Sequence, residues 1–171
     1  MKKVYVAYGS NVNRAQMEKR CPNARFLAVG RLCDYELAFR GSADGAYLTV
    51  VPKKGSSVPV VLWEIGDERE LDRFEGYPWQ YYKDTVTVEV ADQSTVGMIY
   101  KINPNKIVGL PSRAYYAKVH QGYMDFAFDV KILDDALERA FREFYASALT
   151  NPQGTWTFFD GRAYEDCYGD E

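Results

Sequence analysis

The segment Val4-Tyr5-Val6-Ala7-Tyr8-Gly9-Ser10-Asn11 joins a short apolar run to a turn, and the prediction of the fold begins here. The apolar residues followed by turn residues predict a strand over residues 4–8. A helix is predicted from about Arg14, because Asn13 can act as its N-cap with Gln16 three residues later. Residues 21–23, Cys-Pro-Asn, end that helix. The chain therefore opens as a strand, a turn and a helix.

Strand-like runs dominate the middle of the chain, and strands are expected at 26–29, 34–39, 47–51, 58–65, 85–90 and 96–102. Residues 85–90, Thr-Val-Thr-Val-Glu-Val, alternate cleanly, which is typical of a strand with one buried and one solvated face. Residues 52–57, Pro-Lys-Lys-Gly-Ser-Ser, place turn-forming residues between two apolar runs. We therefore expect a hairpin loop at residues 52–57.

Further helices are expected between and after these strands. A short helix is predicted over 68–75, where Asp67 can act as the N-cap and Gly76 follows the last turn as the C′ residue. Ser112 can cap a second helix, and apolar residues at helical spacing over 133–148 predict a third. Because long alternating strand–helix–strand units are missing, the order predicts an α+β fold with an antiparallel sheet or barrel and helices at its ends.

The composition limits the class of protein. The chain has 171 residues, 47% hydrophobic and 26% charged, which is typical of one globular domain. Its 21 Lys and Arg against 24 Asp and Glu give a net charge of −3, which argues against a nucleic-acid partner. One histidine, and three cysteines without a Cys-x-x-Cys spacing, argue against a multi-histidine metal site and a disulfide framework.

The N-terminal residues 1–6 are basic and then apolar, but the apolar run stops at Gly9. That is too short for a signal-peptide core or a membrane span, and no later run approaches about 18 apolar residues. An odd number of cysteines without paired spacing is typical of a reducing compartment. We therefore expect a soluble cytoplasmic protein without a membrane partner.

The turn at residues 8–11, Tyr-Gly-Ser-Asn, is the first candidate for a binding site. Backbone N–H groups at such a strand-to-helix turn can point at one spot and bind an anion or carboxylate. Gly9 suits a ligand that approaches the backbone closely. From these residues alone, an ordinary strand-to-helix turn is the favoured interpretation.

Glu75 is the second candidate, at the end of the predicted helix 68–75. It shares a helix face with Leu71 and lies in the last turn, where the helix dipole opposes negative charge. Both effects should raise the pKa of Glu75, which suits a general base and acid near neutral pH. The alternative is a glutamate that reaches into water or pairs with Arg73 or Lys83.

Residues 111–116, Pro-Ser-Arg-Ala-Tyr-Tyr, form the third candidate. Tyr115, in the first turn of the helix capped by Ser112, could donate to a bound carbonyl or carboxylate. The alternative is an aromatic residue that serves packing. A nucleophile–base pair of His120 with a cysteine or Ser10 is a weaker candidate, because no Gly-x-Ser-x-Gly motif surrounds Ser10.

Together these segments resemble the motifs of the γ-glutamylcyclotransferase-like family, which includes the AIG2-like proteins. The family's opening motif is similar to residues 6–11, and its Leu-Asp-x-x-Glu-Gly signature is similar to residues 71–76. Its Pro-Ser-x-x-Tyr segment is similar to residues 111–115, and its second-strand pattern is similar to residues 30–39. Four matches in order are specific, and the resemblance covers about residues 4–145.

The resemblance implies a fold, an activity and a set of site residues. The fold would be a small mixed, largely antiparallel β-barrel with flanking helices. The activity would be cleavage of a γ-glutamyl amide by the substrate's own α-amine, giving 5-oxoproline and a free amine or amino acid, without a cofactor or metal. Glu75 would carry the proton as general base and acid. By motif match, the substrate-binding residues would be Tyr8, Gly9, Ser10, Asn11 and Tyr115.

The remaining expectations concern the domain boundaries, the partners and an alternative function. Residues 1–149 would form the γ-glutamylcyclotransferase-like domain, and residues 150–171 would be an aromatic extension that packs on it or is partly disordered. The partner would be a small γ-glutamyl molecule, and a homodimer is possible. The alternative function is a non-catalytic or regulatory domain that binds γ-glutamyl or 5-oxoproline-like ligands. The aromatic segment 123–128 is expected to reshape the leaving-group end of the pocket.

Overall fold

The computed structural model describes residues 2–42 and 45–150. Its elements, in chain order, are β1 (Lys3–Ala7), the 3-10 helix η1 (Ser10–Val12), α1 (Arg14–Arg20), β2 (Arg25–Ser42), β3 (Gly45–Ile65), α2 (Arg69–Glu75), β4 (Tyr81–Val90), β5 (Gln93–Ile102), β6 (Ile107–Val108), α3 (Arg113–Asp125) and α4 (Lys131–Thr150). The expected extension lies outside the described residues, apart from Thr150.

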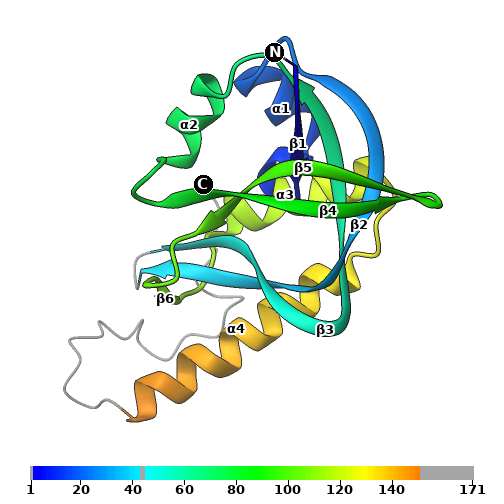
Figure 1. Cartoon of the computed structure of the whole chain (residues 1–171). Helices are drawn as coiled ribbons and strands as arrows, with labels where there is room; N and C mark the ends of the chain where they lie inside the picture. The colour runs from blue at the N-terminus through cyan, green and yellow to red at the C-terminus, as the bar shows by residue number, and fades with distance from the viewer. Residues whose placement is uncertain (1, 43–44, 151–171) are drawn as a thin grey trace.

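The strands close into a mixed barrel. Their order is β3-β1-β5-β4-β2-β6, and an additional pairing of β2 with β3 closes the ring. β1 runs parallel to β5, whereas the other neighbouring strands are antiparallel. Figure 1 shows α1 and α2 at one end of this barrel and α4 along its other side, beside β2 and β3. The predicted α+β fold with a largely antiparallel barrel is confirmed.

The predicted hairpin loop at residues 52–57 is wrong. These residues continue β3, which runs from Gly45 to Ile65 and pairs with β2 over most of its length. The turn-forming residues are accommodated by an irregularity instead of a reversal. The register shifts between Cys33 and Tyr35, and Asp34 and Gly55 have positive φ values of 60° and 81°. The backbone N–H of Gly55 donates to the Asp34 carboxylate at 2.8 Å, which fixes this bend.

The local signals for strand 85–90 and for the helix ends are largely confirmed. Along β4, Val86 and Val88 are buried, whereas Thr85, Thr87 and Glu89 are exposed. The Asn13 side chain caps α1 by accepting from the N–H of Gln16 at 3.0 Å. α2 ends at Gly76 in the left-handed conformation that glycine favours. The start of α2 differs, because its N-cap is Glu68, although the Asp67 carboxylate accepts from the N–H of Arg69.

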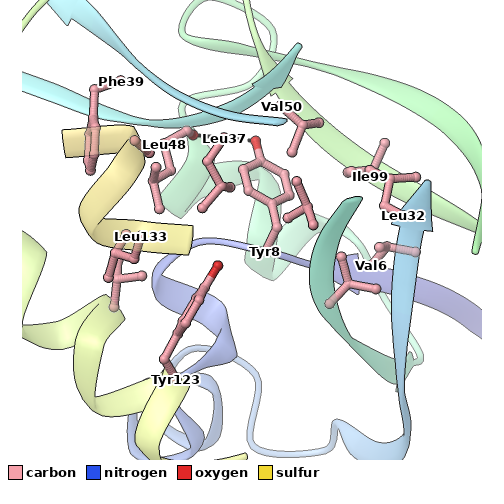
Figure 2. Close-up of a cluster of buried hydrophobic side chains, with 14 of the residues drawn as sticks. Val6, Tyr8, Leu32, Leu37, Phe39, Leu48, Val50, Ile99, Tyr123 and Leu133 are labelled. Atoms are coloured by element: carbon pink, nitrogen blue, oxygen red, sulfur yellow. Dashed lines mark hydrogen bonds between the residues drawn. The ribbon is translucent and has the colours of Figure 1, made fainter. Parts of the chain in front are cut away.

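Two buried apolar clusters fill the barrel and the space beneath its helices. The larger one includes Val6, Tyr8, Leu32, Leu37, Phe39, Leu48, Val50, Ile99, Tyr123 and Leu133. Figure 2 shows the Tyr8 ring within this cluster, among side chains from several strands. The smaller cluster holds the apolar residues of α1 and α2, Met17 and Leu71, against the opposite faces of β1 and β3. Both helices that lead to the candidate site are therefore anchored in the core.

Helix α3 fixes the turn that follows β1. A Cβ atom at Gly122 would lie 2.6 Å from the backbone nitrogen of Asn13, so only glycine lets the helix come this close. The Asn13 side chain donates to the carbonyl of Lys118 at 3.1 Å. These contacts hold η1 in place between β1 and α1. Separately, the described part of the chain contains no helix long and apolar enough to cross a membrane.

Candidate active site

A cavity lies where the end of β1, the end of α2 and the start of α3 meet. It encloses about 280 Å³ of space, part of which is open to solvent. Its lining residues are Tyr5, Tyr8, Gly9, Ser10, Asn11, Leu48, Glu75, Tyr81, Tyr100 and Tyr115. All six residues singled out in the sequence are among them. The structure therefore brings together three segments that are far apart in the chain.

Glu75 is the acidic residue of this lining. It is the last residue of α2, and its side chain is 11% exposed. Burial raises the pKa of Glu75, whereas the nearby charge of Arg20 and a hydrogen bond from Asn11 partly oppose that rise. A carboxyl group with a raised pKa can both accept and return a proton near neutral pH.

The partners of Glu75 are not those that the sequence suggested. The Asn11 side chain donates from Nδ2 to Oε1 of Glu75 at 2.9 Å, and Nη1 of Arg20 lies 3.5 Å from the same oxygen. Lys83 pairs with Glu68 and Asp72 instead. Arg20 carried no signal in the sequence, because its closeness to Glu75 depends on how α1 and α2 meet.

The turn after β1 contributes Gly9, Ser10 and Asn11 to the cavity lining. The N–H groups of Val12 and Asn13 donate to the carbonyls of Gly9 and Ser10 and so form the first hydrogen bonds of η1. The N–H groups of Ser10 and Asn11 precede these bonds, and such groups have no carbonyl partner within the helix. The indole N–H of Trp63 holds the carbonyl of Asn11 at 3.1 Å. The turn is thus fixed in a form that can receive a carboxylate.

Tyr115 faces this turn from the first part of α3. Its hydroxyl accepts the backbone N–H of Leu48 at 3.1 Å, so its own proton remains available to another acceptor. A Cβ atom at Gly9 would lie 3.3 Å from this hydroxyl, so glycine leaves room for it. The ring packs edge-to-face on Tyr47, with 5.0 Å between ring centroids. Ser112 caps the helix as predicted, by accepting from the N–H of Tyr115.

Three further tyrosines of the lining escaped the sequence analysis: Tyr5, Tyr81 and Tyr100. The Tyr5 hydroxyl accepts from Nδ2 of Asn11 at 2.9 Å, and the Tyr100 hydroxyl donates to Asp72 at 2.5 Å. Burial raises the pKa of each of the three, so their hydroxyls are neutral at pH 7. Tyr5 and Tyr100 lie in predicted strands, whereas Tyr81 precedes the predicted strand 85–90 and belongs to β4 in the structure. Which face of each strand turns toward the cavity was not visible in the sequence.

Of the alternative nucleophile–base pairs, His120 and the described cysteines do not line this cavity, whereas Ser10 does. The ring of His120 lies 6.2 Å from that of Tyr116, on α3. Burial raises the pKa of the Cys21 thiol to about 11, so it is protonated at neutral pH. Cys33 also has a raised pKa, and Cys167 lies outside the described residues. Within residues 2–42 and 45–150, no group of three or more His, Cys, Asp or Glu residues is arranged to hold a metal ion.

The aromatic segment 123–128 does not contribute to the cavity lining, contrary to expectation. Tyr123 is fully buried in the larger core cluster. Phe126 stacks on Phe26 with 5.4 Å between ring centroids, and the guanidinium of Arg14 lies over the Phe126 ring. The segment joins α3 to the outside of β2.

The comparison with known families identifies the same family as the sequence motifs. The family model described as "Gamma-glutamyl cyclotransferase, AIG2-like" matches residues 5–119, which hold all the candidate residues. The chain belongs to this family. Within the matched residues, the turn after β1, the end of α2 and the start of α3 contribute to one cavity.

One curated protein is similar to part of this chain, and two solved structures share its fold. The chain is 32% identical to a human Gamma-glutamylcyclotransferase over 99 residues, which cover 53% of this chain and 52% of that protein. It thus spans about half the length of that curated relative. A solved structure named Gamma-glutamyl cyclotransferase has a TM-score of 0.71 at 23% identity, covering 80% of this chain and 86% of that chain. The solved structure of an uncharacterized human protein has a TM-score of 0.71 at 25% identity. The match covers 79% of this chain and 86% of that chain.

Proposed function

We propose that this protein is a γ-glutamyl cyclotransferase that converts a γ-glutamyl amide into 5-oxoproline and a free amine or amino acid. The α-nitrogen of the substrate forms a bond to its own γ-carbonyl carbon, and the bond from that carbon to the leaving nitrogen breaks. Both reacting groups belong to one molecule, so holding it in a folded conformation supplies much of the rate. The family membership supports the class of reaction.

Glu75 is the proposed proton carrier. As a carboxylate it takes a proton from the α-ammonium group, which frees the nitrogen to attack, and it then gives that proton to the leaving nitrogen. The attacking nitrogen loses a second proton as the lactam forms, and this proton ends on the released amine, which leaves in its ammonium form. The net reaction releases no proton and consumes no water. A partly buried glutamate with a raised pKa suits both steps, because the rise brings its two protonation states closer in free energy at neutral pH.

The rest of the cavity would hold the zwitterionic head of the substrate. The N–H groups of Ser10 and Asn11 would bind the α-carboxylate, and the free proton of the Tyr115 hydroxyl would reach the γ-glutamyl group. The observation that carries this proposal is that the Glu75 carboxylate shares one small cavity with the turn of residues 9–11 and with Tyr115. The negative charge of Glu75 complements the substrate's α-ammonium group, and the N–H groups of the turn complement its α-carboxylate. Both substrate groups are bonded to the same carbon atom.

Release of 5-oxoproline from a panel of γ-glutamyl amines, amino acids and peptides tests the proposal. The parent should release 5-oxoproline from at least one compound, and Glu75→Gln should lower kcat by about 100-fold or more. Glu70→Gln, at an exposed position of the same helix, is the matched control and should retain parent activity. Full activity in Glu75→Gln would exclude the general-base role.

The other function considered for this family is binding without turnover. Saturable binding of 5-oxoproline together with no release from any compound in the panel would favour it. The partly buried Glu75 favours catalysis, because a binding domain gains nothing from a carboxylate whose ionised form is destabilised by burial.

A further inference from the structure

We propose that Arg20 is a positioning residue for Glu75: its guanidinium fixes the Asn11 side chain in the orientation in which the Asn11 amide donates to the Glu75 carboxylate. The inference rests on the proposed function, since it explains how the proton carrier is held toward the cavity. Arg20 is the last residue of α1, and Glu75 is the last residue of α2. The two helix ends therefore meet at Asn11.

The hydrogen bonds of Asn11 leave one orientation for its amide. Nη1 of Arg20 donates to Oδ1 of Asn11 at 2.9 Å, and a guanidinium can only donate. The Nδ2 group of Asn11 donates to Glu75 at 2.9 Å and to the Tyr5 hydroxyl at 2.9 Å. A flipped amide would face Arg20 with a second donor and Glu75 with a second acceptor. Arg20 thereby specifies which end of Asn11 meets the carboxylate.

The burial of Arg20, Asn11 and Glu75 favours a strong effect of the Arg20 charge on Glu75. The Asn11 residue is 2% exposed, and the side chains of Arg20 and Glu75 are 22% and 11% exposed. Charges in such sites are screened less than at an open surface. The guanidinium lies 5.0 Å from the centre of the Phe74 ring, which covers it on one side. The arginine is therefore held in place by its own contacts, independently of any substrate.

The other titratable groups that line the cavity are tyrosines, and they are neutral at pH 7. Burial raises the pKa of every tyrosine that lines it: Tyr5, Tyr8, Tyr81, Tyr100 and Tyr115. Among the described residues, Arg20 is therefore the charged group recorded beside the Glu75 carboxylate. Its loss should raise the pKa of Glu75, because the charge that opposes the effect of burial disappears.

The test compares Arg20→Met, Arg20→Lys and Lys19→Met with the parent. Methionine keeps an apolar side chain beside Phe74 but removes the positive charge and the N–H donors of the guanidinium. Lysine keeps the positive charge but not the planar arrangement of N–H donors. Lys19→Met removes a neighbouring exposed charge from the same helix turn and is the matched control. Thermal unfolding first establishes that each variant folds.

Arg20→Met should lower kcat about tenfold or more, with little change in KM, and should shift the acid limb of the kcat–pH profile to higher pH. Arg20→Lys should keep the acid limb near that of the parent, with an intermediate kcat. Lys19→Met should match the parent in both. Unchanged kcat and an unchanged acid limb in a folded Arg20→Met would overturn the proposal, as would an Arg20→Lys that behaves like Arg20→Met.

A second readout does not depend on turnover. In protein with ¹³C-labelled glutamate carboxyl groups, the Glu75 resonance is assigned by its loss in Glu75→Gln and then titrated. Its pKa should be higher in Arg20→Met than in the parent and unchanged in Lys19→Met. If the parent releases no 5-oxoproline, the proposed function fails, yet a shifted Glu75 titration still supports the role of Arg20. An identical titration in the parent and Arg20→Met overturns that role.

Discussion

The side-chain amide of Asn11 donates to the carboxylate of Glu75 at 2.9 Å, although 64 positions separate the two residues in the chain. Asn11 lies in the turn that would bind the substrate's carboxylate, and Glu75 is the proposed proton carrier. The two halves of the candidate site are therefore joined by a direct hydrogen bond. Several of the predictions below depend on this junction.

Replacement of Asn11 by aspartate should impair both activity and stability. It would place a second carboxylate against Glu75 in a site that is 2% exposed, so the two groups cannot both ionise easily. We expect kcat for 5-oxoproline release to fall at least about tenfold. Thermal unfolding should show a Tm lower by several degrees. Asn23→Asp makes the same chemical change at an exposed position and should leave both values near the parent.

Removal of the Tyr115 hydroxyl should weaken substrate binding. Tyr115→Phe keeps the ring that packs on Tyr47 but leaves the backbone N–H of Leu48 without its acceptor. The free energy of unfolding should fall by about 1 kcal/mol, as measured by urea denaturation. KM should rise for every γ-glutamyl compound that the parent turns over. Tyr47→Phe, which keeps the same ring contact, serves as the control, and an unchanged KM in Tyr115→Phe would count against the proposed contact.

A methyl group at position 9 should disturb the site while the fold survives. The Cβ of Gly9→Ala would lie 3.3 Å from the Tyr115 hydroxyl and 3.7 Å from the Cβ of Leu48, a tight fit that shifts the hydroxyl. We expect kcat/KM to fall by about tenfold, because small displacements at a reacting centre are costly. Gly66→Ala, where a Cβ would meet no atom within 4 Å, should be neutral in the same assay.

The pH dependence of activity should follow Glu75. The base must be ionised to accept the proton from the substrate, and its pKa is raised above the ordinary value of a glutamate. The kcat/KM should therefore fall on acidification at a pH clearly above about 4.3, the usual pKa of a glutamate side chain. A profile that stays flat down to that pH would mean that Glu75 is not the titrating base.

The same shift predicts how Glu75→Gln changes stability. Between the ordinary pKa and the raised one, the folded state binds more protons than the unfolded state, so this contribution to stability falls as the pH rises through that window. Glutamine cannot ionise and avoids the loss. Relative to the parent, Glu75→Gln should gain stability as the pH rises from about 4 to above the raised pKa, as measured by urea denaturation across that range. Equal pH dependence in the two proteins would contradict the raised pKa.

Local signals in the sequence predicted most individual elements. The cap at Asn13, the glycine at position 76 and the alternation in β4 depend on neighbouring residues and could be recognised without the fold. The structure of residues 52–57 could not be recognised in this way. These turn-forming residues produce a bend at Gly55 inside a long strand and do not reverse the chain. Pairing of β3 with β2 outweighed the local preference of residues 52–57 for a turn. Such pairing involves residues that are distant in the chain.

The sequence by itself determined the family and the residue types at the candidate site, because the motifs around Gly9, Glu75 and Tyr115 are short and keep their order. The surroundings of Glu75 were decided by the tertiary structure. Closure of the barrel by β2 and β3 and the meeting of α1 with α2 bring Arg20 and Asn11 to the carboxylate. The pKa of Glu75 depends on burial and on these two neighbours, and both are properties of packing between segments that no local pattern encodes.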